Sequence, residues 1–382
     1  MTIKVSHFVG LSGIGGVQRN FFEYMGFAKD ADITHKVYTM GGVDEEYTTS
    51  FKTFNILNVI NLLVFIRDII SSNTIVHFYN NLSSLKLLIF LFFLPTKKIV
   101  MHERGGVWNT PLSRSFVIRN IIKKVDMIIA NSNATKAILN QKFYISNNKI
   151  QVIHNGIDTT AYCVKDKVNS EKKFIIGFLG RFDTPKGVKI LIDAVKHINS
   201  VGGYTDNFEL HIAGDGPLAS CLKDISKDVD NIRFIGRVDS PHLFLSKIDL
   251  LVVPSIREPL GNVCLEAGLC KVAVIASSVD GIPEIIDDNV SGKLIVPKEK
   301  LDKSCFSEES VPFPEVVYFP DCKKIDTPLQ VDFKELSDEI VRLMGNDNLR
   351  HFYANNLNMR VIKYFNIDRY VSELHSLYRS LL

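Results

Sequence analysis

Two carboxylates that stand eight residues apart, Glu258 and Glu266, are the most informative feature of the sequence. The apolar run at 249–254 predicts a buried strand that ends at a proline, and the residues from Val263 onward predict a helix. The first carboxylate therefore lies on the loop after a strand, and the second lies inside the following helix. In an open α/β sheet, ligands bind at this carboxyl edge of the strands.

Backbone amides at the start of the predicted helix would complete an anion site. Gly261 and Asn262 permit a tight turn after Leu260, and the amides of Gly261, Asn262 and Val263 would point out of the helix start toward a phosphate. Carboxylates accept hydrogen bonds from hydroxyl groups, so two of them beside such a site predict a sugar-nucleotide site. Solvated surface acids are the alternative interpretation of the pair taken alone.

A loop with two cations, at 180–187, follows the predicted strand 174–179. Arg181 can bind a diphosphate through two parallel hydrogen bonds, and Lys186 adds a compact charge. Gly180 gives the loop its backbone freedom. A solvated basic loop explains these residues equally well on their own. The acidic pair in the same half of the chain favours diphosphate binding.

Two features of the first half could contribute to a ligand site. A glycine-rich turn at 10–16 precedes a predicted helix, and Gly15 and Gly16 would let the backbone approach a phosphate. Its spacing differs from the dinucleotide-binding fingerprint, and a simple tight connection is the alternative. His102 closes the predicted strand 99–101, where it is either a structural histidine or a side chain that faces a cleft.

The order of the elements predicts two α/β domains in tandem, with a cleft between them as the ligand site. Short apolar runs alternate with amphipathic segments, and the polar segment 158–173 interrupts this alternation once. We expect a long loop or insertion at 302–328 and helices at 336–344 and 349–382. Strands are expected at 3–8, 36–39, 74–78, 98–101, 127–130 and 151–153, and then at 174–179, 209–213, 232–235, 250–253 and 273–276.

Composition and charge fit an ordinary globular protein with an anionic partner. Hydrophobic residues make up 46% and charged residues 23% of the 382 residues. The net charge is +3, but residues 1–165 hold 18 Lys and Arg against 10 Asp and Glu, a net +8, which leaves −5 for the rest. A membrane surface or a diphosphate-bearing acceptor would each match the basic half, and a chance imbalance is the alternative. We expect no nucleic-acid partner.

The cysteines and the apolar segments indicate a cytoplasmic protein. The first residues run directly into a strand and lack a signal-peptide pattern. The six cysteines predict neither a zinc site nor a disulfide framework, and several fall in apolar segments, as reduced core cysteines do. The apolar run 87–94 is too short to span a bilayer, which needs roughly 20 residues. We expect a buried helix there, with shallow membrane contact as the alternative.

These segments together resemble the retaining glycosyltransferases of family 4, which have the GT-B fold. The matching segments are 13–19, 130–132, 152–158, 180–187, 213–217 and 258–266, followed by Gly-Ile-Pro-Glu at 281–284. The resemblance implies two Rossmann-like, doubly wound domains at 1–160 and 174–355 that face a central cleft. It also implies that a C-terminal helix at 356–382 packs back on the first domain.

The resemblance implies a role for each matching residue. Arg181 and Lys186 would hold the donor diphosphate, Glu258 would bind the hydroxyls of the donor sugar, and Glu266 would bind the ribose. His102 would contact the donor sugar or the transition state. Besides these, the residues expected to line the donor site are Gly15, Gly16, Gly180, Gly214, Leu260, Gly261, Asn262 and Val263.

The expected reaction is the transfer of a hexosyl or N-acetylhexosaminyl group from a UDP- or GDP-linked donor to a hydroxyl. The acceptor would be a polyprenyl-diphosphate-linked saccharide of a bacterial surface polysaccharide, with peripheral contact to the inner membrane. The resemblance further implies that no metal is needed and that substitution occurs on one face of the sugar, where the leaving phosphate takes the acceptor's proton. No residue is an obvious nucleophile for a double displacement.

The chain departs from the family pattern at two places, and two other functions are alternatives to transfer. The chain has Cys-Lys-Val-Ala at 270–273 in place of a small residue, a glycine and a proline, and Asp280 in place of a glycine. A sugar-nucleotide epimerase of the same fold and a non-catalytic sugar-nucleotide-binding subunit are the alternatives. The basic loop combined with the acidic pair favours transfer, and the intact site residues argue against a degenerate subunit.

Overall fold

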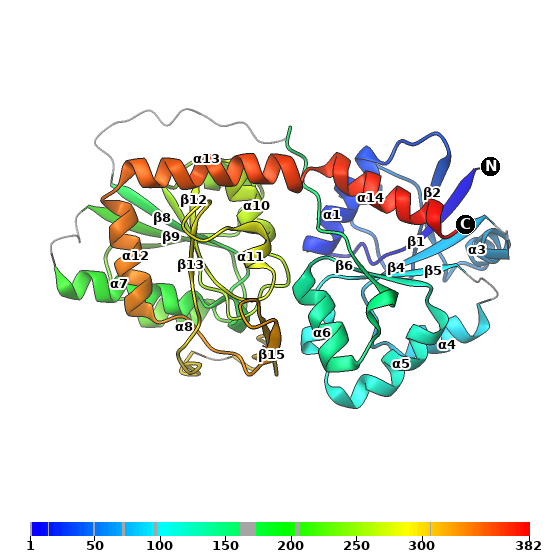
Figure 1. The fold of residues 1–382 in the computed structure, drawn as a ribbon, viewed down its shortest axis with the longest axis horizontal. Helices are drawn as coiled ribbons and strands as arrows, with labels where there is room; N and C mark the ends of the chain where they lie inside the picture. Colours follow the sequence, from blue (N-terminus) through cyan, green and yellow to red (C-terminus); the bar gives the residue numbers. More distant parts are fainter. Residues whose placement is uncertain are drawn as a thin grey trace. The chain divides into compact units, whose positions relative to one another are not determined.

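The computed structural model describes residues 2–13, 15–48, 50–70, 73–94, 98–160, 173–202, 207–305 and 307–382. The chain forms two compact units, which Figure 1 shows coloured along the sequence. Unit 1 contains Met1–Asp158 and Phe365–Leu382, and unit 2 contains Thr159–Tyr364. We describe each unit by itself.

Unit 1 is built on a seven-stranded parallel sheet in the order β3-β2-β1-β4-β5-β6-β7. Every residue of β4 is buried, as expected for a parallel strand covered on both faces. The order reverses direction between β1 and β4, which makes the carboxyl ends of these strands a ligand-binding edge. The strands are β1 (Ile3–Phe8), β2 (Ile33–Thr39), β3 (Thr53–Asn55), β4 (Thr74–Tyr79), β5 (Ile99–Glu103), β6 (Met127–Ala130) and β7 (Ile150–Val152).

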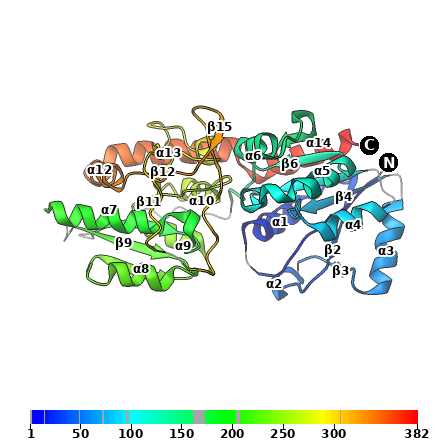
Figure 2. The same cartoon turned by 90° about the horizontal axis from the view of Figure 1, so that it is seen from below.

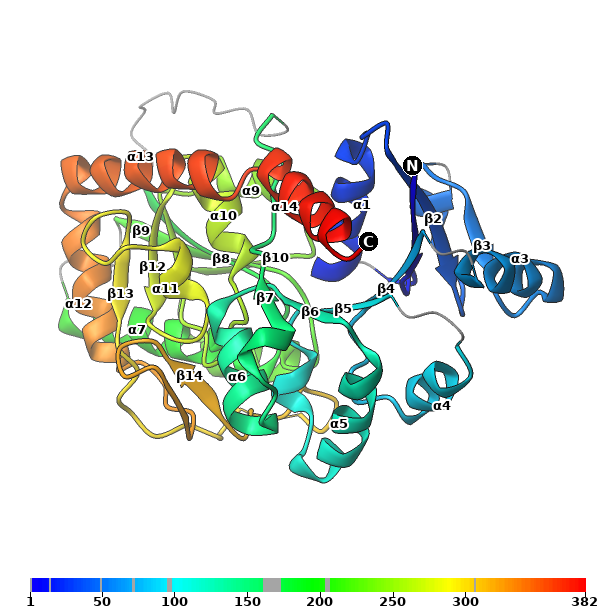
Figure 3. The same cartoon turned by 45° about the vertical axis from the view of Figure 1, so that its right-hand side comes forward.

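Helices cover both faces of this sheet, as the alternating side chains of β1 show. His7 contacts rings of α1 on one face, whereas the next residue, Phe8, packs against Phe65 of α3 and Phe90 of α4 on the other. The C-terminal α14 packs beside α1 (Figure 3). The helices are α1 (Gly16–Phe27), α2 (Glu45–Thr48), α3 (Val59–Ile70), α4 (Leu85–Phe93), α5 (Ser115–Lys124), α6 (Asn133–Phe143) and α14 (Ile367–Ser380).

Unit 2 repeats this topology with a six-stranded parallel sheet in the order β10-β9-β8-β11-β12-β13. The order reverses between β8 and β11, so the loops that follow these two strands meet at one edge. The strands are β8 (Phe174–Leu179), β9 (Phe208–Ala213), β10 (Ile232–Gly236), β11 (Leu250–Val253), β12 (Ala273–Ser277) and β13 (Lys293–Ile295). The helices are α7 (Val188–Val201), α8 (Ala219–Ser226), α9 (Pro241–Leu245), α10 (Asn262–Leu269), α11 (Ile282–Ile285), α12 (Phe333–Met344) and α13 (Asp347–Tyr364).

The expected fold class, two Rossmann-like domains with doubly wound parallel sheets, is confirmed. The chain returns to unit 1 at 364/365 rather than at 355/356. The expected boundary falls inside α13, where Leu357 and Val361 still pack closely against Gly268 of α10 in unit 2. Backbone hydrogen bonds between Ile157 and both Phe365 and Ile367 then join the terminal helix to unit 1.

Two other expectations about the elements are wrong. The run 87–94 does not form a fully buried helix, because α4 buries Leu87 and Leu91 but leaves Phe92 and Phe93 70% and 78% exposed. The cysteines are not all reduced either, because Cys221 and Cys305 form a disulfide. Cys163 lies outside the described residues.

The segment 302–328 is more ordered than the expected loop. It contains a two-stranded antiparallel hairpin, β14 (Val317–Phe319) and β15 (Lys324–Asp326), which can be located in Figures 1 and 3. Val317 is fully buried, so the hairpin is packed onto unit 2 rather than extended into solvent.

Candidate functional site

Glu258 and the basic loop meet at the carboxyl edge of the sheet of unit 2. β8 and β11 are neighbours in the sheet, and the loops that follow them carry Lys186 and Glu258, respectively. The Lys186 Nζ lies 2.6 Å from Glu258 Oε2, and the Ser255 Oγ lies 3.5 Å from the same oxygen. The Lys186 side chain is 32% exposed and that of Glu258 is 10% exposed, so the pair is open to solvent from the lysine side.

Arg181 stands on the same loop and points more fully into solvent. Its Nε lies 2.6 Å from Asp183 Oδ2, while 61% of the arginine side chain remains exposed. A single carboxylate cannot satisfy the five N–H donors of a guanidinium, so Arg181 retains donors for an anionic ligand. Arg181 and Lys186 are therefore two cations on one loop, each held by one carboxylate.

Two glycines allow the loops of this edge to approach each other. At Gly187, with a φ of +66°, an added Cβ would lie 2.0 Å from the carbonyl oxygen of Pro254. At Gly214, with a φ of +137°, it would lie 1.8 Å from the carbonyl oxygen of Gly180. Only glycine fits at these two positions. Gly214 packs against Gly180 of the basic loop.

The helix start beside Glu258 has the predicted form. Gly261 has a φ of +102° and precedes α10, which begins at Asn262, one residue earlier than expected. No side chain caps this helix start, and the Cys264 amide donates to the Gly261 carbonyl at 2.9 Å. Glu266 lies one turn into α10 and is half-buried, whereas Leu260 is buried beneath the turn.

Sequence reasoning gave no role to three charged residues around this pair. Asp183 holds Arg181, Asp280 accepts a hydrogen bond from the Glu258 amide at 2.9 Å, and Arg257 is half-buried near both acids. Burial lowers the pKa of Arg257, and the charges of Asp280, Glu258 and Asp183 act in the opposite direction. The unusual acid at 280 was the only one of the three that the sequence marked, as a departure from the family pattern.

The glycine-rich turn of unit 1 lies at the start of α1. Gly15 is the residue before the helix, with extended backbone angles, and Gly16 is its first residue. No side chain caps this helix start, and the Gly13 amide donates a hydrogen bond to Asp44 Oδ2 at 2.9 Å. The turn thus has the expected strand-to-helix position and an exposed helix start.

His102 is the penultimate residue of β5 and lies inside an aromatic cluster. The ring is fully buried, and it stacks on His77 and Tyr79 with centroids 5.5 Å away in each case. Neither ring nitrogen has a hydrogen-bond partner among the described residues. Burial, followed by the charges of Arg104 and His77, lowers the pKa of His102 well below its ordinary value, so the ring is neutral.

The structure thus brings most of the predicted site together within unit 2. Lys186 contacts Glu258 there, and Gly214 packs against Gly180 of the loop that carries Arg181 and Lys186. Gly15, Gly16 and His102 belong to unit 1. In the described part of the chain, no group of three or more His, Cys, Asp or Glu side chains has a geometry suited to a metal ion.

Family profiles match each half of the chain. The family described as "Glycosyl transferases group 1" matches residues 173–306, and the one described as "Glycosyltransferase Family 4" matches residues 14–161. These ranges contain all of the predicted site residues.

Individual proteins show the same similarity. The chain is 34% identical over 191 residues to the "uncharacterized 41.2 kDa protein in cps region" of Klebsiella pneumoniae, a match that covers 47% of this chain and 50% of the relative. It is 27% identical over 206 residues, 52% of this chain and 54% of the relative, to the N-acetylgalactosamine-N,N'-diacetylbacillosaminyl-diphospho-undecaprenol 4-alpha-N-acetylgalactosaminyltransferase of Campylobacter jejuni. The chain spans about half the length of these curated relatives.

A solved structure matches over the whole chain. HepE of Anabaena, crystallised with UDP-glucose, superimposes with a TM-score of 0.73 and 17% identity, covering 99% of this chain and all of HepE. At this identity the match establishes a shared fold.

Proposed function

We propose, because the chain belongs to the group 1 glycosyltransferases of the GT-B fold, that it transfers a sugar from a nucleotide-diphosphate donor to a hydroxyl of an acceptor. The observation that carries the proposal is the 2.6 Å contact between Lys186 and Glu258. In a sugar nucleotide the anomeric carbon is bonded directly to the diphosphate. A cation for the phosphate and a carboxylate for the sugar hydroxyls must therefore lie side by side, as these two groups do.

The neighbouring groups fit the remaining parts of such a donor. Arg181 can bind the diphosphate through its exposed donors, and the start of α10 would add the positive end of the helix dipole. Glu266, one turn into α10, would accept hydrogen bonds from the ribose hydroxyls. His102 is assigned a contact with the donor sugar or the transition state by family resemblance alone.

The proposed reaction retains the anomeric configuration. The acceptor oxygen bonds to the anomeric carbon on the face from which the diphosphate leaves, and a phosphate oxygen takes the acceptor's proton. Arg181 and Lys186 compensate the charge that develops on the leaving diphosphate, and electrostatic stabilisation of this kind is a large contribution in enzymes. We propose that these two cations supply what a divalent metal supplies in other transferases.

For the donor we propose a UDP- or GDP-linked sugar, and for the acceptor a lipid-linked saccharide of a bacterial surface polysaccharide. HepE binds UDP-glucose, which supports the first choice. The Campylobacter relative acts on a diphospho-undecaprenol saccharide, and the Klebsiella relative is named for a cps region, which support the second. Such an acceptor would place the reaction on the cytoplasmic face of the inner membrane.

One surface of unit 1 supports a peripheral contact with that membrane. The helices α3 and α4 adjoin through the buried ring of Phe65 and the half-buried ring of Phe90, whose centroids lie 6.0 Å apart. The helix α4 also packs beside α5 (Figure 2). Among the described residues, none of the helices has the length and apolar run needed to cross a bilayer. The exposed apolar side chains on the three helices and the turns before them are Leu57, Val59, Ile60, Leu63, Ile66, Ile70, Leu85, Ile89, Phe92, Phe93, Leu112 and Phe116.

The charges around this apolar surface match an anionic bilayer. Residues 84–125 contain eight Lys and Arg but a single acid, Glu103, which is buried. Lys124 lies over the ring of Phe92 at 5.4 Å, so cationic and apolar groups are interleaved. Apolar side chains that insert below the headgroups, with cations at their level, are the features of an interfacial helix.

A donor screen tests the proposed transfer. Purified protein is incubated with UDP-, GDP-, ADP- and dTDP-sugars, and nucleotide release is followed with and without a bacterial lipid extract. We expect acceptor-dependent release from one donor, at least about a hundredfold slower in Glu258→Gln. Glu299→Gln, an exposed acid away from the site, is the matched control and should leave the rate unchanged. Nucleotide binding without release would favour a non-catalytic subunit, and sugar interconversion without acceptor would favour an epimerase.

Vesicle sedimentation tests the membrane contact separately. The protein should sediment with vesicles that contain phosphatidylglycerol, and binding should weaken at high salt because exposed charges are screened. The double substitution Phe92→Ser and Phe93→Ser should reduce binding at least about tenfold, because each buried CH₂ group contributes roughly 0.8 kcal/mol. Phe352→Ser on α13, which removes an exposed ring from unit 2, is the control. Equal binding by wild type and the double variant would contradict this part of the proposal.

A further inference from the structure

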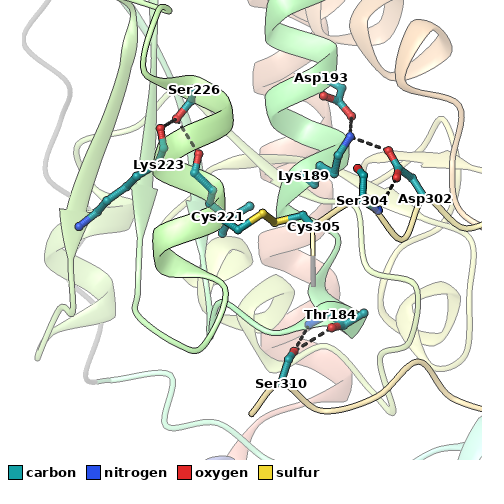
Figure 4. The surroundings of a disulfide bond; sticks show 11 residues. Thr184, Lys189, Asp193, Cys221, Lys223, Ser226, Asp302, Ser304, Cys305 and Ser310 are labelled. Atoms are coloured by element: carbon teal, nitrogen blue, oxygen red, sulfur yellow. Dashed lines mark hydrogen bonds and ion pairs between the residues drawn. A yellow bond between two sulfur atoms is a disulfide. The ribbon is translucent and has the colours of Figure 1, made fainter. Parts of the chain in front are cut away.

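The segment 302–328, here called the strap, is hydrogen-bonded to the basic loop of the site. The side chain of Ser310 accepts a hydrogen bond from the Thr184 amide at 3.0 Å and lies 3.1 Å from Asp183 Oδ1 (Figure 4 shows Thr184 and Ser310). The Val311 amide donates to the same Asp183 oxygen at 2.9 Å. The other oxygen of Asp183 holds Arg181. One buried carboxylate therefore joins the strap to the loop that carries both cations.

The strap also reaches Glu258 through a second buried carboxylate. Asp280 Oδ1 accepts from the amide of Tyr318 in β14 at 2.7 Å, and its Oδ2 accepts from the Glu258 amide at 2.9 Å. The Asp280 amide in turn donates to the Tyr318 carbonyl at 2.9 Å. Asp280 is fully buried, with a φ of +48°, a backbone conformation that few residues other than glycine and asparagine adopt readily.

The strap is fixed at both ends, so these contacts are not those of a freely moving loop. At its start the Cys221–Cys305 disulfide ties it to α8, and Lys189 Nζ lies 2.6 Å from Asp302 Oδ2 (Figure 4). Just beyond its end, Gln330 and Glu299 exchange backbone hydrogen bonds, each at 2.9 Å. The disulfide and the ion pair anchor the start of the strap, and the backbone pair anchors its end. The contacts with the site lie between these two ends.

Asp183 and Asp280 lie beside the proposed anion site, where an uncompensated carboxylate would repel a diphosphate. Both oxygens of each acid already interact with donors of the protein, which compensate the negative charge. The half-buried Arg257 interacts favourably with both acids and with Glu258. The two acids therefore hold neighbouring parts of the protein in place and do not bind the ligand themselves.

We infer that the strap is a working part of the donor site, in which Asp183 and Asp280 are positioning residues that set the basic loop and Glu258 at their working separation. The inference rests on the proposed function for its kinetic consequences. The contacts through Ser310 position the diphosphate-binding loop, whereas the contact through Asp280 positions the group that binds the sugar. Loss of each contact should consequently affect a different property.

Two substitutions separate these effects. Ser310→Ala removes the bonds to Asp183 and Thr184 without touching the loop itself, so it should weaken UDP or GDP binding about three- to tenfold, the loss expected for one or two hydrogen bonds. Asp280→Asn keeps the shape but replaces an acceptor by a donor that faces an amide. It should lower kcat about tenfold or more, since small misplacements of a reacting group are costly, while nucleotide affinity changes less than about threefold. Ser307→Ala, in the same strap, is the matched control: its oxygen accepts from the Glu309 amide.

Amide hydrogen exchange gives a readout that does not depend on activity. In Ser310→Ala the amides of 182–187 should exchange faster, and in Asp280→Asn those of 256–260 should do so, with the rest of unit 2 unchanged. If the wild type transfers no sugar but these local changes occur, the positioning inference stands and the proposed function fails. If both variants are folded and match the wild type in hydrogen exchange, nucleotide affinity and kcat, the strap does not position the site residues and the inference is overturned.

Discussion

At the scale of single residues, the site pairs each of its two cations with a carboxylate that is largely buried. Glu258 is largely covered, and a buried carboxylate is tolerated when it is paired and hydrogen-bonded. Lys186 provides that pairing and remains one-third exposed, so it can contact a phosphate without leaving its carboxylate. Arg181 is the more exposed cation, with 61% of its side chain in solvent.

The two cations should therefore differ in weight. Lys186→Ala leaves Glu258 without its partner and removes a charge from the diphosphate, so we expect a loss in kcat/KM of about 10²–10³. Arg181→Ala should cost about tenfold, because the exposed guanidinium is replaced by water more readily. Steady-state kinetics with the preferred donor measures both losses. Equal and small effects of the two substitutions would contradict the assignment.

Metal removal tests the proposed role of the cations from the other side. If Arg181 and Lys186 compensate the leaving diphosphate, treatment with excess EDTA followed by desalting should leave the transfer rate within about twofold. A rate that collapses and is restored by Mg²⁺ or Mn²⁺ would show that the charge is compensated by a bound ion.

Gly214 offers a test of packing at the same edge. Gly214→Ala adds a methyl group that would lie 1.8 Å from the Gly180 carbonyl oxygen, at a φ that side chains avoid. The basic loop must shift, so we expect lower nucleotide affinity and a loss of roughly 2–4 kcal/mol in the free energy of unfolding. Gly202→Ala, where a methyl group would meet open space and φ is also positive at +83°, controls for backbone strain. Equal effects of both substitutions would show that strain, and not the clash, is responsible.

At the scale of elements, the Cys221–Cys305 disulfide ties the start of the strap covalently to α8. Cys221 and Cys305 enclose 84 residues of sequence separation, and closing a loop of that length stabilises a fold by up to about 4–5 kcal/mol in the chain-entropy model. The two cysteines lie on α8 and on the segment after β13, which the sheet brings together.

Loss of this bond should be visible as lost stability. We expect Cys305→Ser to lower the free energy of unfolding by about 2–5 kcal/mol, measured by denaturant titration. Reductant should lower the stability of the wild type to a similar level and should leave the variant unchanged. Cys322→Ser, which replaces an exposed free cysteine, is the control. No response of the wild type to reductant would contradict a structural disulfide.

The elements also show how far the sequence leads. Apolar runs of β-type followed by amphipathic segments predicted both sheets, apart from the three-residue edge strands β3 and β13. They also predicted the position of Glu258 after β11, because buried parallel strands are uniformly apolar. The break at 365 carried a local signal, since the Asn366 side chain caps α14 by accepting from the Arg369 amide, but it was hidden within a long helical pattern. Pairing of Cys221 with Cys305, and of Asp280 with Tyr318, depends on contacts far apart in the chain that no local pattern encodes.

At the scale of the molecule, the two ends of the chain are joined in unit 1 by a buried cluster of histidines and tyrosines. His77 Nδ1 lies 2.6 Å from the Tyr378 hydroxyl of α14, and His7 Nε2 lies 2.9 Å from His35 Nδ1. His375 of α14 lies 2.8 Å from Asp30 Oδ2. The C-terminal helix is therefore held to the rest of unit 1 by polar side chains, among them buried histidines and tyrosines.

This cluster predicts acid sensitivity. Burial lowers the pKa of His7, His77 and His102 well below 6.5 and that of His35 to about 4. Unfolded histidines take up protons below about pH 6.5 whereas these stay neutral in the fold, so stability is complete above pH 6.5 and falls as the pH drops toward 4. Each histidine contributes up to about 1.4 kcal/mol per pH unit.

Denaturant titrations of unit 1 fluorescence between pH 7.5 and 4.5 measure this fall; Trp108, the single tryptophan, lies in that unit. Replacement His35→Gln removes one group that titrates and should reduce the slope by one proton. A free energy of unfolding that stays constant over this range would contradict the neutral cluster.

The measurement that tests the central claim most directly is the transfer of labelled sugar. Donor labelled in the sugar is incubated with lipid-linked acceptor and the wild-type protein, Lys186→Ala or Glu258→Gln, and the product is extracted and its anomeric configuration is determined by NMR. The predicted result is label in the lipid fraction with the donor's configuration, at least about a hundredfold less with either variant. Label that remains in the nucleotide or appears as free sugar, or equal transfer by the variants, would contradict a transferase that works through this ion pair.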